Sequence, residues 1–212
     1  MKKWIKKVGQ NKFQFFFFVG ILALLFVALV LASTMQPIDT PNDEDPIDEL
    51  PIDKPDDKPI VEVIKLPFET TMNYKIVRKF YERDASQEDQ ERALIKYGKS
   101  YRTSVGTSYA NTEGTDFDVL SAMSGKVVQI VNNPLFGTYV VVEHKDNVKT
   151  YYYGLSEVSV TVDSLVKQGD KLGVSGYTEI DQEAGNHVYF KVVRGNKHIN
   201  PEKAIGKKTA EL

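Results

Sequence analysis

The stretch "GKVVQIVNNPLFGTYVVVEHKDNVKTYYYGL", residues 125–155, decides the fold class of this chain of 212 residues. Its short runs of valine and tyrosine are separated by Gly, Asn and Asp turns, a pattern typical of consecutive β-strands. Similar runs continue through "VSVTV", "KLGVSG" and "GNHVYFKVV" to residue 193. Only "DASQEDQERALIKYG", residues 84–98, has the cap, acidic first turn and apolar stripe of a helix. The sequence therefore predicts a mainly β domain, an antiparallel sheet or sandwich with one short helix.

Charge is distributed unevenly along the chain, although its formal net charge is only -2. Residues 1–12 carry five lysines and no acid, whereas residues 39–58 carry nine acids against two lysines. The rest of the chain is balanced, so it offers no bulk positive field that would favour nucleic acid as a partner. There is no cysteine, which excludes disulfides, lipid attachment to cysteine and thiolate metal sites.

A membrane anchor is expected near the N-terminus, because no residue from Phe13 to Ile38 is charged. The run "FFFFVGILALLFVALVLA", residues 15–32, is long enough to span a bilayer as a helix. The preceding lysines predict that residues 1–12 are cytoplasmic, that 13–35 form the anchor and that the rest is extracytoplasmic. The alternative is a cleaved signal peptide, but the apolar run is long for one and no clear small-x-small cleavage site follows it.

Residues 36–60 predict an extended linker between the anchor and the globular part. They hold six of the nine prolines and repeat "PID" three times among the acids. Prolines remove hydrogen-bond donors and the acids repel one another, so the segment cannot bury a core. It would hold the domain away from the membrane surface.

The order of the β-runs resembles the LytM, or lysostaphin-type, zinc endopeptidase domain. The resemblance runs from "VGTSYANTEGTDFDVLSAMSGKVVQI" to "GNHVYFKV". We expect this domain over residues 100–205, after a strand-and-helix region at 61–99 and before a tail at 206–212. In that family three ligands hold zinc and leave one position for a water molecule, while two histidines assist catalysis.

The residues at the five functional positions of that family are mostly changed in this chain. The resemblance puts the metal ligands at Ser104, Ser108 and Tyr189, and the catalytic histidines at Gly154 and His187. Neutral hydroxyls are not ordinary zinc ligands, and glycine has no side chain. The resemblance therefore implies a degenerate domain with no metal, no cofactor and no enzymatic activity, in which His187 is a relic.

Three further residues bear on this interpretation. Lys191 stands where the family usually has an acid, two residues after Tyr189. His144 and His198 lack the closely spaced companion of a preformed metal site, so we expect them to be hydrogen-bonded or surface residues.

The segment before the domain resembles the SpoIIQ family of sporulation proteins. The resemblance rests on "YKIVRKFYERDASQEDQERALIKYGKSYRTSVGTSYA", residues 74–110, and on the inserted "IDQEAGNH", residues 180–187. It implies a forespore membrane protein that faces the intermembrane space and binds a SpoIIIAH-like membrane protein of the mother cell. The pair would form a ring-like channel or feeding tube and assist engulfment.

The partner-facing surface is not defined by the sequence. A sheet offers edge strands for pairing, and large amphipathic tyrosines are enriched at interfaces. Tyrosine candidates for such an interface are Tyr139, Tyr151, Tyr152, Tyr153 and Tyr189, although alternation buries about half of any strand. The alternative functions are a peptidoglycan-binding pseudo-endopeptidase and an activator of a cell-wall amidase. An active endopeptidase is disfavoured by the changed ligand positions.

Overall fold

The structure is a computed structural model that describes residues 62–212. The predicted cytoplasmic segment, anchor and linker at residues 1–60 lie outside the described residues. Between residues 62 and 212, no helix is long and apolar enough to cross a membrane.

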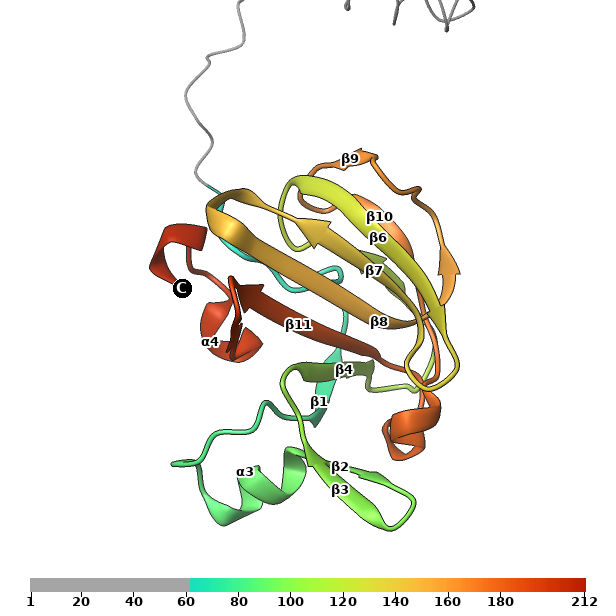
Figure 1. Cartoon of the computed structure of the whole chain (residues 1–212). Coiled ribbons are helices and arrows are strands. Elements are labelled where there is room, and N and C mark those ends of the chain that lie inside the picture. The colour runs from blue at the N-terminus through green and yellow to red at the C-terminus, as the bar shows by residue number, and fades with distance from the viewer. Residues whose placement is uncertain (1–61) are drawn as a thin grey trace, which may run out of the picture. The chain divides into compact units, whose positions relative to one another are not determined.

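A ten-stranded antiparallel sheet dominates the described residues (Figure 1). Its main path runs β1-β4-β11-β8-β7-β6-β9, while β10 pairs with β5 and β8, and β12 pairs with β11. The strands are β1 (Tyr74–Arg78), β4 (Thr107–Asn111), β5 (Asp118–Leu120), β6 (Gly125–Asn133), β7 (Gly137–Glu143), β8 (Val148–Val158), β9 (Leu165–Val166), β10 (Lys171–Ser175), β11 (Val188–Arg194) and β12 (Lys197–Ile199). The predicted mainly β, antiparallel architecture is confirmed.

Alternation along β8 shows how the sheet divides its side chains. Val148, Thr150 and Tyr152 are buried, whereas the residues between them are partly exposed. The buried face packs against a single core that also takes in Ile64 and Leu172. Burying an aliphatic side chain of this size contributes roughly 1.5–3 kcal/mol. The opposite face of β7, β8 and β11 remains partly open to solvent, and the candidate site is built beside it.

The helical prediction for residues 84–98 is only partly correct. Helix α3 (Gln87–Arg92) begins as expected, because the Ser86 side chain accepts a hydrogen bond from the Asp89 amide. The helix then stops at Ala93, whose carbonyl accepts a hydrogen bond from the Ser104 amide, and the following residues form a strand instead of a helical stripe. Tertiary pairing overrides the local helical pattern here. This hairpin comprises β2 (Leu94–Tyr97) and β3 (Ser100–Thr103).

The expectation of a single short helix is also wrong. A second α-helix and three short 3₁₀ segments occur within residues 62–212. They are η1 (Lys145–Asn147), η2 (Glu179–Ala184), α4 (Pro201–Ala204) and η3 (Thr209–Glu211). Each is too short to show a helical period, so sequence periodicity gave no signal for them.

His144 takes part in a buried chain of hydrogen bonds. Its Nδ1 lies 2.9 Å from the Ser124 carbonyl oxygen and its Nε2 lies 2.7 Å from Thr150 Oγ1. Because a carbonyl only accepts, Nδ1 carries the proton and Nε2 accepts from the threonine hydroxyl. Thr150 Oγ1 in turn lies 3.0 Å from the Tyr152 hydroxyl, which accepts from the Ala122 amide at 2.9 Å. The expectation that His144 is hydrogen-bonded is confirmed; His198, on β12, is exposed, as a surface residue should be.

We predict that the domain loses stability as the pH falls from about 7.5 to about 5. Burial lowers the pKa of His144 and of His187, so the unfolded chain binds protons that the folded chain resists. Stability is therefore fully present above the ordinary histidine pKa and declines below it, by at most about 1.4 kcal/mol per pH unit per histidine.

Urea unfolding at several pH values measures this slope. His144→Gln should reduce the pH dependence more than His198→Gln, because His198 is exposed and only partial burial and the charge of Lys191 lower its pKa. An identical slope in wild type and His144→Gln would contradict the assignment of a neutral buried imidazole.

Candidate functional site

Three of the five positions carried over from the zinc endopeptidases line one cavity, and the other two, Ser104 and Gly154, lie next to residues that line it. Strand pairing places Tyr189 of β11 opposite Ser108 of β4 on one side and Tyr153 of β8 on the other. Ser108, His187 and Tyr189 line a cavity of about 220 Å³. Antiparallel pairing thus brings together residues that are about 80 positions apart in the chain, as the family resemblance implies.

Tyr189 and Ser104, two former ligand positions, are hydrogen-bonded to each other. Their hydroxyl oxygens lie 3.3 Å apart, and Tyr189 Oη also accepts from the Val105 amide at 3.0 Å. The tyrosine ring lies against Gly106, where a Cβ would come within 2.8 Å of the ring. Burial raises the pKa of the Tyr189 phenol, which therefore stays neutral at physiological pH. A neutral phenol that is hydrogen-bonded in this way is a poor zinc ligand.

The side-chain hydroxyl of Ser108, the remaining ligand position, has no hydrogen-bond partner within residues 62–212. Its side chain is fully buried and its Oγ makes no hydrogen bond there. Thr178 also lines the cavity, and its buried hydroxyl likewise has no hydrogen-bond partner within residues 62–212. Buried polar atoms are normally satisfied, so two unpartnered hydroxyls on one cavity wall call for an explanation.

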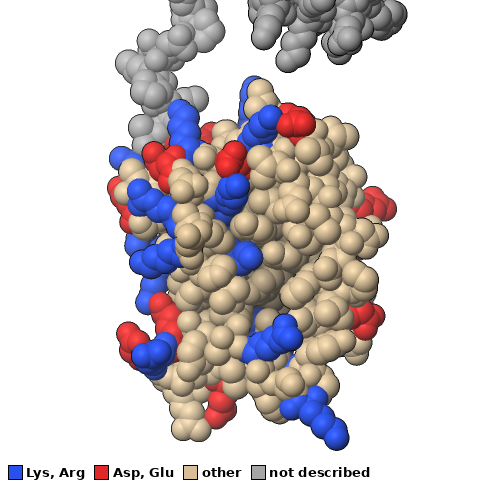
Figure 2. All heavy atoms as spheres, viewed as in Figure 1, with Lys and Arg blue, Asp and Glu red and all other residues tan. Residues whose placement is uncertain are grey.

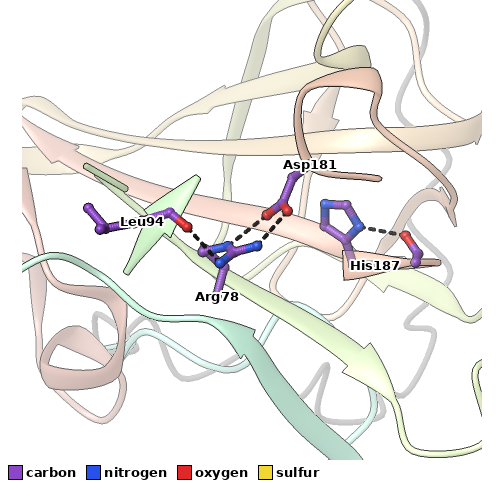
Figure 3. A network of polar contacts seen from close by, with 5 residues as sticks. Arg78, Leu94, Asp181 and His187 are labelled. Carbon is purple, nitrogen blue, oxygen red and sulfur yellow. Dashed lines mark hydrogen bonds and ion pairs between the residues drawn. The ribbon is translucent and has the colours of Figure 1, made fainter. Parts of the chain in front are cut away.

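A buried ion pair between Arg78 and Asp181 forms one side of the site (Figure 3). Nε lies 2.9 Å from Oδ2 and Nη2 lies 2.6 Å from Oδ1, while Nη1 donates to the Leu94 carbonyl at 2.6 Å. Arg78 is paired in register with Ser108, so its positive charge comes from the strand beside the former ligands. Asp181 lies on η2, and neither residue was singled out as functional by the sequence reasoning. No local pattern links two residues 103 positions apart.

His187 is held as a neutral imidazole. Its Nδ1 lies 2.8 Å from the Gly185 carbonyl, so Nδ1 donates and Nε2 is left as an acceptor on the cavity side. Burial lowers its pKa more than the nearby Asp181 raises it. Figure 3 shows the imidazole next to the Asp181 carboxylate, which is already engaged by Arg78.

Ser108, His187 and Asp181 are the residue types of a serine hydrolase triad, but they do not form one. In a working triad the carboxylate accepts from Nδ1 and the serine hydroxyl bonds to Nε2. Here the Gly185 carbonyl accepts from Nδ1 of His187, and the Arg78 guanidinium donates to the Asp181 carboxylate. No hydrogen bond joins Ser108 to His187. The arrangement therefore lacks an activated nucleophile.

Gly154, the position of the other catalytic histidine, is restricted by its backbone. It lies at a bulge in β8 with φ of +81°, a conformation that favours glycine. A Cβ there would lie 3.0 Å from Thr178 Cγ2 and 3.3 Å from the His187 carbonyl oxygen. A histidine at 154 would therefore be both strained and crowded.

The donor set at this site does not fit zinc. Two serines and a hydrogen-bonded tyrosine replace the three ligands, and a guanidinium stands beside them. Within residues 62–212 no group of three His, Cys, Asp or Glu side chains is placed to hold a metal ion. The predictions of no metal and no cofactor stay predictions, to be tested on the purified chain.

Comparison with known proteins identifies the relatives of this chain. Residues 102–201 match peptidase family M23. The chain is 38% identical over 152 residues to stage II sporulation protein Q (SpoIIQ) of Bacillus subtilis strain 168. That alignment covers 72% of this chain and 54% of SpoIIQ, so the chain spans about half the length of that relative. The predicted resemblance to SpoIIQ is confirmed.

Two further relatives show how the similarity is distributed. A chain in the structure of the SpoIIQ–SpoIIIAH pore-forming complex has a TM-score of 0.69 at 38% identity, covering 71% of this chain and 96% of that one. The peptidoglycan DD-endopeptidase ShyB of Vibrio cholerae is 34% identical over 99 residues, which is 47% of this chain and 22% of ShyB. The likeness to the sporulation protein therefore extends further along this chain than the likeness to the endopeptidase.

We predict that Arg78→Met and Asp181→Asn each destabilise the domain by about 3–5 kcal/mol, because each leaves one buried group of the pair without its partner. The double variant Arg78→Met/Asp181→Leu should recover a large part of this loss, since no unpaired charge remains buried. Guanidinium unfolding of the three variants measures the effect.

The exposed pair Lys126–Asp163, with atoms 2.7 Å apart, provides the matched control. Lys126→Met should change the free energy of unfolding by less than about 1 kcal/mol. Equal changes in the free energy of unfolding at the two pairs would contradict the prediction that the Arg78–Asp181 pair is more important for stability than an exposed ion pair.

Proposed function

Because the chain belongs to peptidase family M23 and is related to SpoIIQ, we propose that it is a non-catalytic, membrane-anchored sporulation protein that binds a SpoIIIAH-like partner. One observation carries the proposal. A chain solved within the SpoIIQ–SpoIIIAH complex matches this one over 96% of its length at 38% identity. The similarity includes the segment that precedes the peptidase-like domain.

The non-catalytic part of the proposal is supported by the chemistry of the cavity. Hydrolysis by this family's mechanism needs an open position on zinc and histidines that stabilise the transition state. In this chain the Ser104 and Tyr189 hydroxyls are hydrogen-bonded to each other, and the Ser108 hydroxyl has no hydrogen-bond partner within residues 62–212. Gly154 offers no side chain. A protein with this site works through binding instead of bond cleavage.

The location follows from the sequence of the N-terminal segment. Residues 13–35 would anchor the chain in the forespore membrane, and residues 36–60 would extend the domain into the intermembrane space. Pairing with a mother-cell protein across that space would build a ring-like channel or feeding tube and assist engulfment.

The open edge of β6 is the surface we assign to the partner. β6 is the last long strand of the main path, and β9 pairs only with Gly125 and Lys126 (Figure 1). Val127 is also backbone-bonded, to Ser164 and Asp163, so residues 128–133 of β6 present the edge on which another chain can add a strand. Such pairing gives affinity through main-chain hydrogen bonds and needs nothing from the former catalytic groove.

A second candidate function is a peptidoglycan-binding pseudo-endopeptidase or an activator of a cell-wall amidase. It is favoured by the cavity that remains at the former active site and by the similarity to ShyB over about half the chain. Binding of purified cell-wall fragments in a pull-down, lost in variants of the cavity, would support it.

We predict that acidic substitutions on the β6 edge weaken binding of the extracytoplasmic domain of a SpoIIIAH-like protein by about tenfold or more. Gln129 and Asn132 are exposed there, and Gln129→Asp or Asn132→Asp would place an unpaired charge in a desolvated contact. Calorimetric titration of the full-length chain in an uncharged detergent measures the affinity.

Two controls make this titration decisive. Asn196→Asp makes the same chemical change in the exposed turn between β11 and β12 and should leave affinity unaltered. His187→Ala should also bind normally, although it lowers stability. If the wild-type chain has no affinity for the partner, the proposed function is refuted. If both β6 variants bind with normal affinity, only the assignment of the β6 edge as the binding surface is refuted.

We also predict that the purified chain contains no stoichiometric zinc and cleaves no cell wall, since its ligand positions are Ser104, Ser108 and Tyr189. Elemental analysis and a turbidity assay on cell walls test this. About one zinc per chain, removable by a chelator with loss of cleavage, would contradict it.

A further inference from the structure

The ammonium group of Lys191 lies on the cavity wall without a counter-ion. None of the ion pairs formed within residues 62–212 includes it. Its Nζ lies 4.1 Å from the ring centroid of Tyr151 and donates to the Tyr153 hydroxyl at 3.3 Å. Burial lowers the pKa of Lys191, which reflects the cost of holding a charge there. A partly buried cation with no carboxylate beside it is suited to receive an anion.

The unpartnered hydroxyls of Ser108 and Thr178 line the same cavity. Each is buried, and each has a donor and acceptors to offer. The His187 ring also borders the space, with Nε2 free to accept a hydrogen bond. Two of the four buried hydroxyls that have no hydrogen-bond partner within residues 62–212 therefore line this cavity, and the other two belong to Thr107 and Tyr109.

The charge balance of the wall is positive. Asp181 is the one acidic residue that lines the cavity, and it is neutralised by Arg78. Lys191 and the exposed Arg102 remain as cations. Figure 2 shows that Lys and Arg side chains are interspersed with Asp and Glu side chains around the rim of the face in view, whose middle is mostly uncharged. A negatively charged ligand would meet no repulsive carboxylate inside.

The remaining walls are aromatic and apolar. Tyr153 and Tyr189, with ring centroids 5.7 Å apart, and Phe136, 5.8 Å from Tyr153, border the cavity. The volume of about 220 Å³ is far above what a single water molecule needs. The cavity thus has room for a small organic ligand with one charged end.

We propose that this cavity binds a small carboxylate ligand of the kind found at the free end of a short peptide. The carboxylate pairs with Lys191 and accepts from the Ser108 and Thr178 hydroxyls, while the rest of the ligand lies against the tyrosine rings. A single ammonium and two hydroxyls suit a monoanion. A phosphate dianion is usually held by more donors, often by arginine or backbone amides. This site is separate from the β6 edge, so the inference does not depend on the proposed partner.

Titration of the full-length chain in an uncharged detergent with N-acetylglycylglycine tests the proposal. Its C-terminal amide is the neutral counterpart, and inorganic phosphate is the third ligand. We expect the acid to bind at least tenfold more tightly than either. Equal affinity for acid and amide, or no binding of the acid at concentrations up to tens of millimolar, would overturn the proposal. Preference for phosphate would do the same.

Variants identify the residues responsible. Lys191→Met should weaken binding of the acid at least tenfold, and Lys191→Arg should retain most of it. Thr178→Val should weaken binding several-fold without lowering the melting temperature, because the hydroxyl it removes has no partner in the protein.

Lys149→Met is the matched control, since Lys149 lies on neighbouring β8 and is paired with Glu143 at 3.1 Å. It should bind the acid as the wild type does. Undiminished binding in a folded Lys191→Met variant would show that the ligand is not held by this cation. Loss of SpoIIIAH-like partner binding, with carboxylate binding intact, would refute only the proposed function.

Discussion

The buried pair of Arg78 and Asp181 is the constraint on which the geometry of the cavity depends. It joins β1 to η2 through two residues that are 103 positions apart, and it also reaches the β2–β3 hairpin through the Leu94 carbonyl. Desolvating two charges offsets much of their attraction, so such a pair adds little net stability. Its effect is to specify one arrangement, because displacing η2 would leave a charge buried and unpaired. The wall of the cavity is fixed in this way by side chains of the protein itself.

The described residues present two different surfaces that could bind another molecule. The long edge of β6 offers unpaired backbone groups, which suit recognition of another polypeptide. The cavity between β4, β11 and η2 offers unsatisfied side chains, which suit a small ligand. β8 and β7 lie between β11 and β6 in the strand order, and the cavity approaches β6 only at Phe136, whose amide donates to Asn133 Oδ1.

Much of the fold follows from the sequence because strand alternation and turn residues are local signals. The positions 104, 108, 154, 187 and 189 were found only through family resemblance, and the fold then places 108, 187 and 189 on the wall of one cavity. The end of α3 was missed because hydrogen bonding between Ala93 and Ser104 overrides the local helical pattern. The Arg78–Asp181 pair was missed for a related reason, since pairing over such a distance leaves no periodic trace.

The changes at the positions that hold zinc in the endopeptidases are distributed over several residues, and the fold retains the cavity with these changes in place. Tyr189 needs Gly106 beneath its ring, and its hydroxyl is held by Ser104 and the Val105 amide. Gly154 has a backbone conformation that disfavours any side chain. A histidine restored at one position would therefore find neither a partner ligand nor the space that a metal requires. Because these contacts support one another, the sheet is stable with the former active site in a form suited to binding.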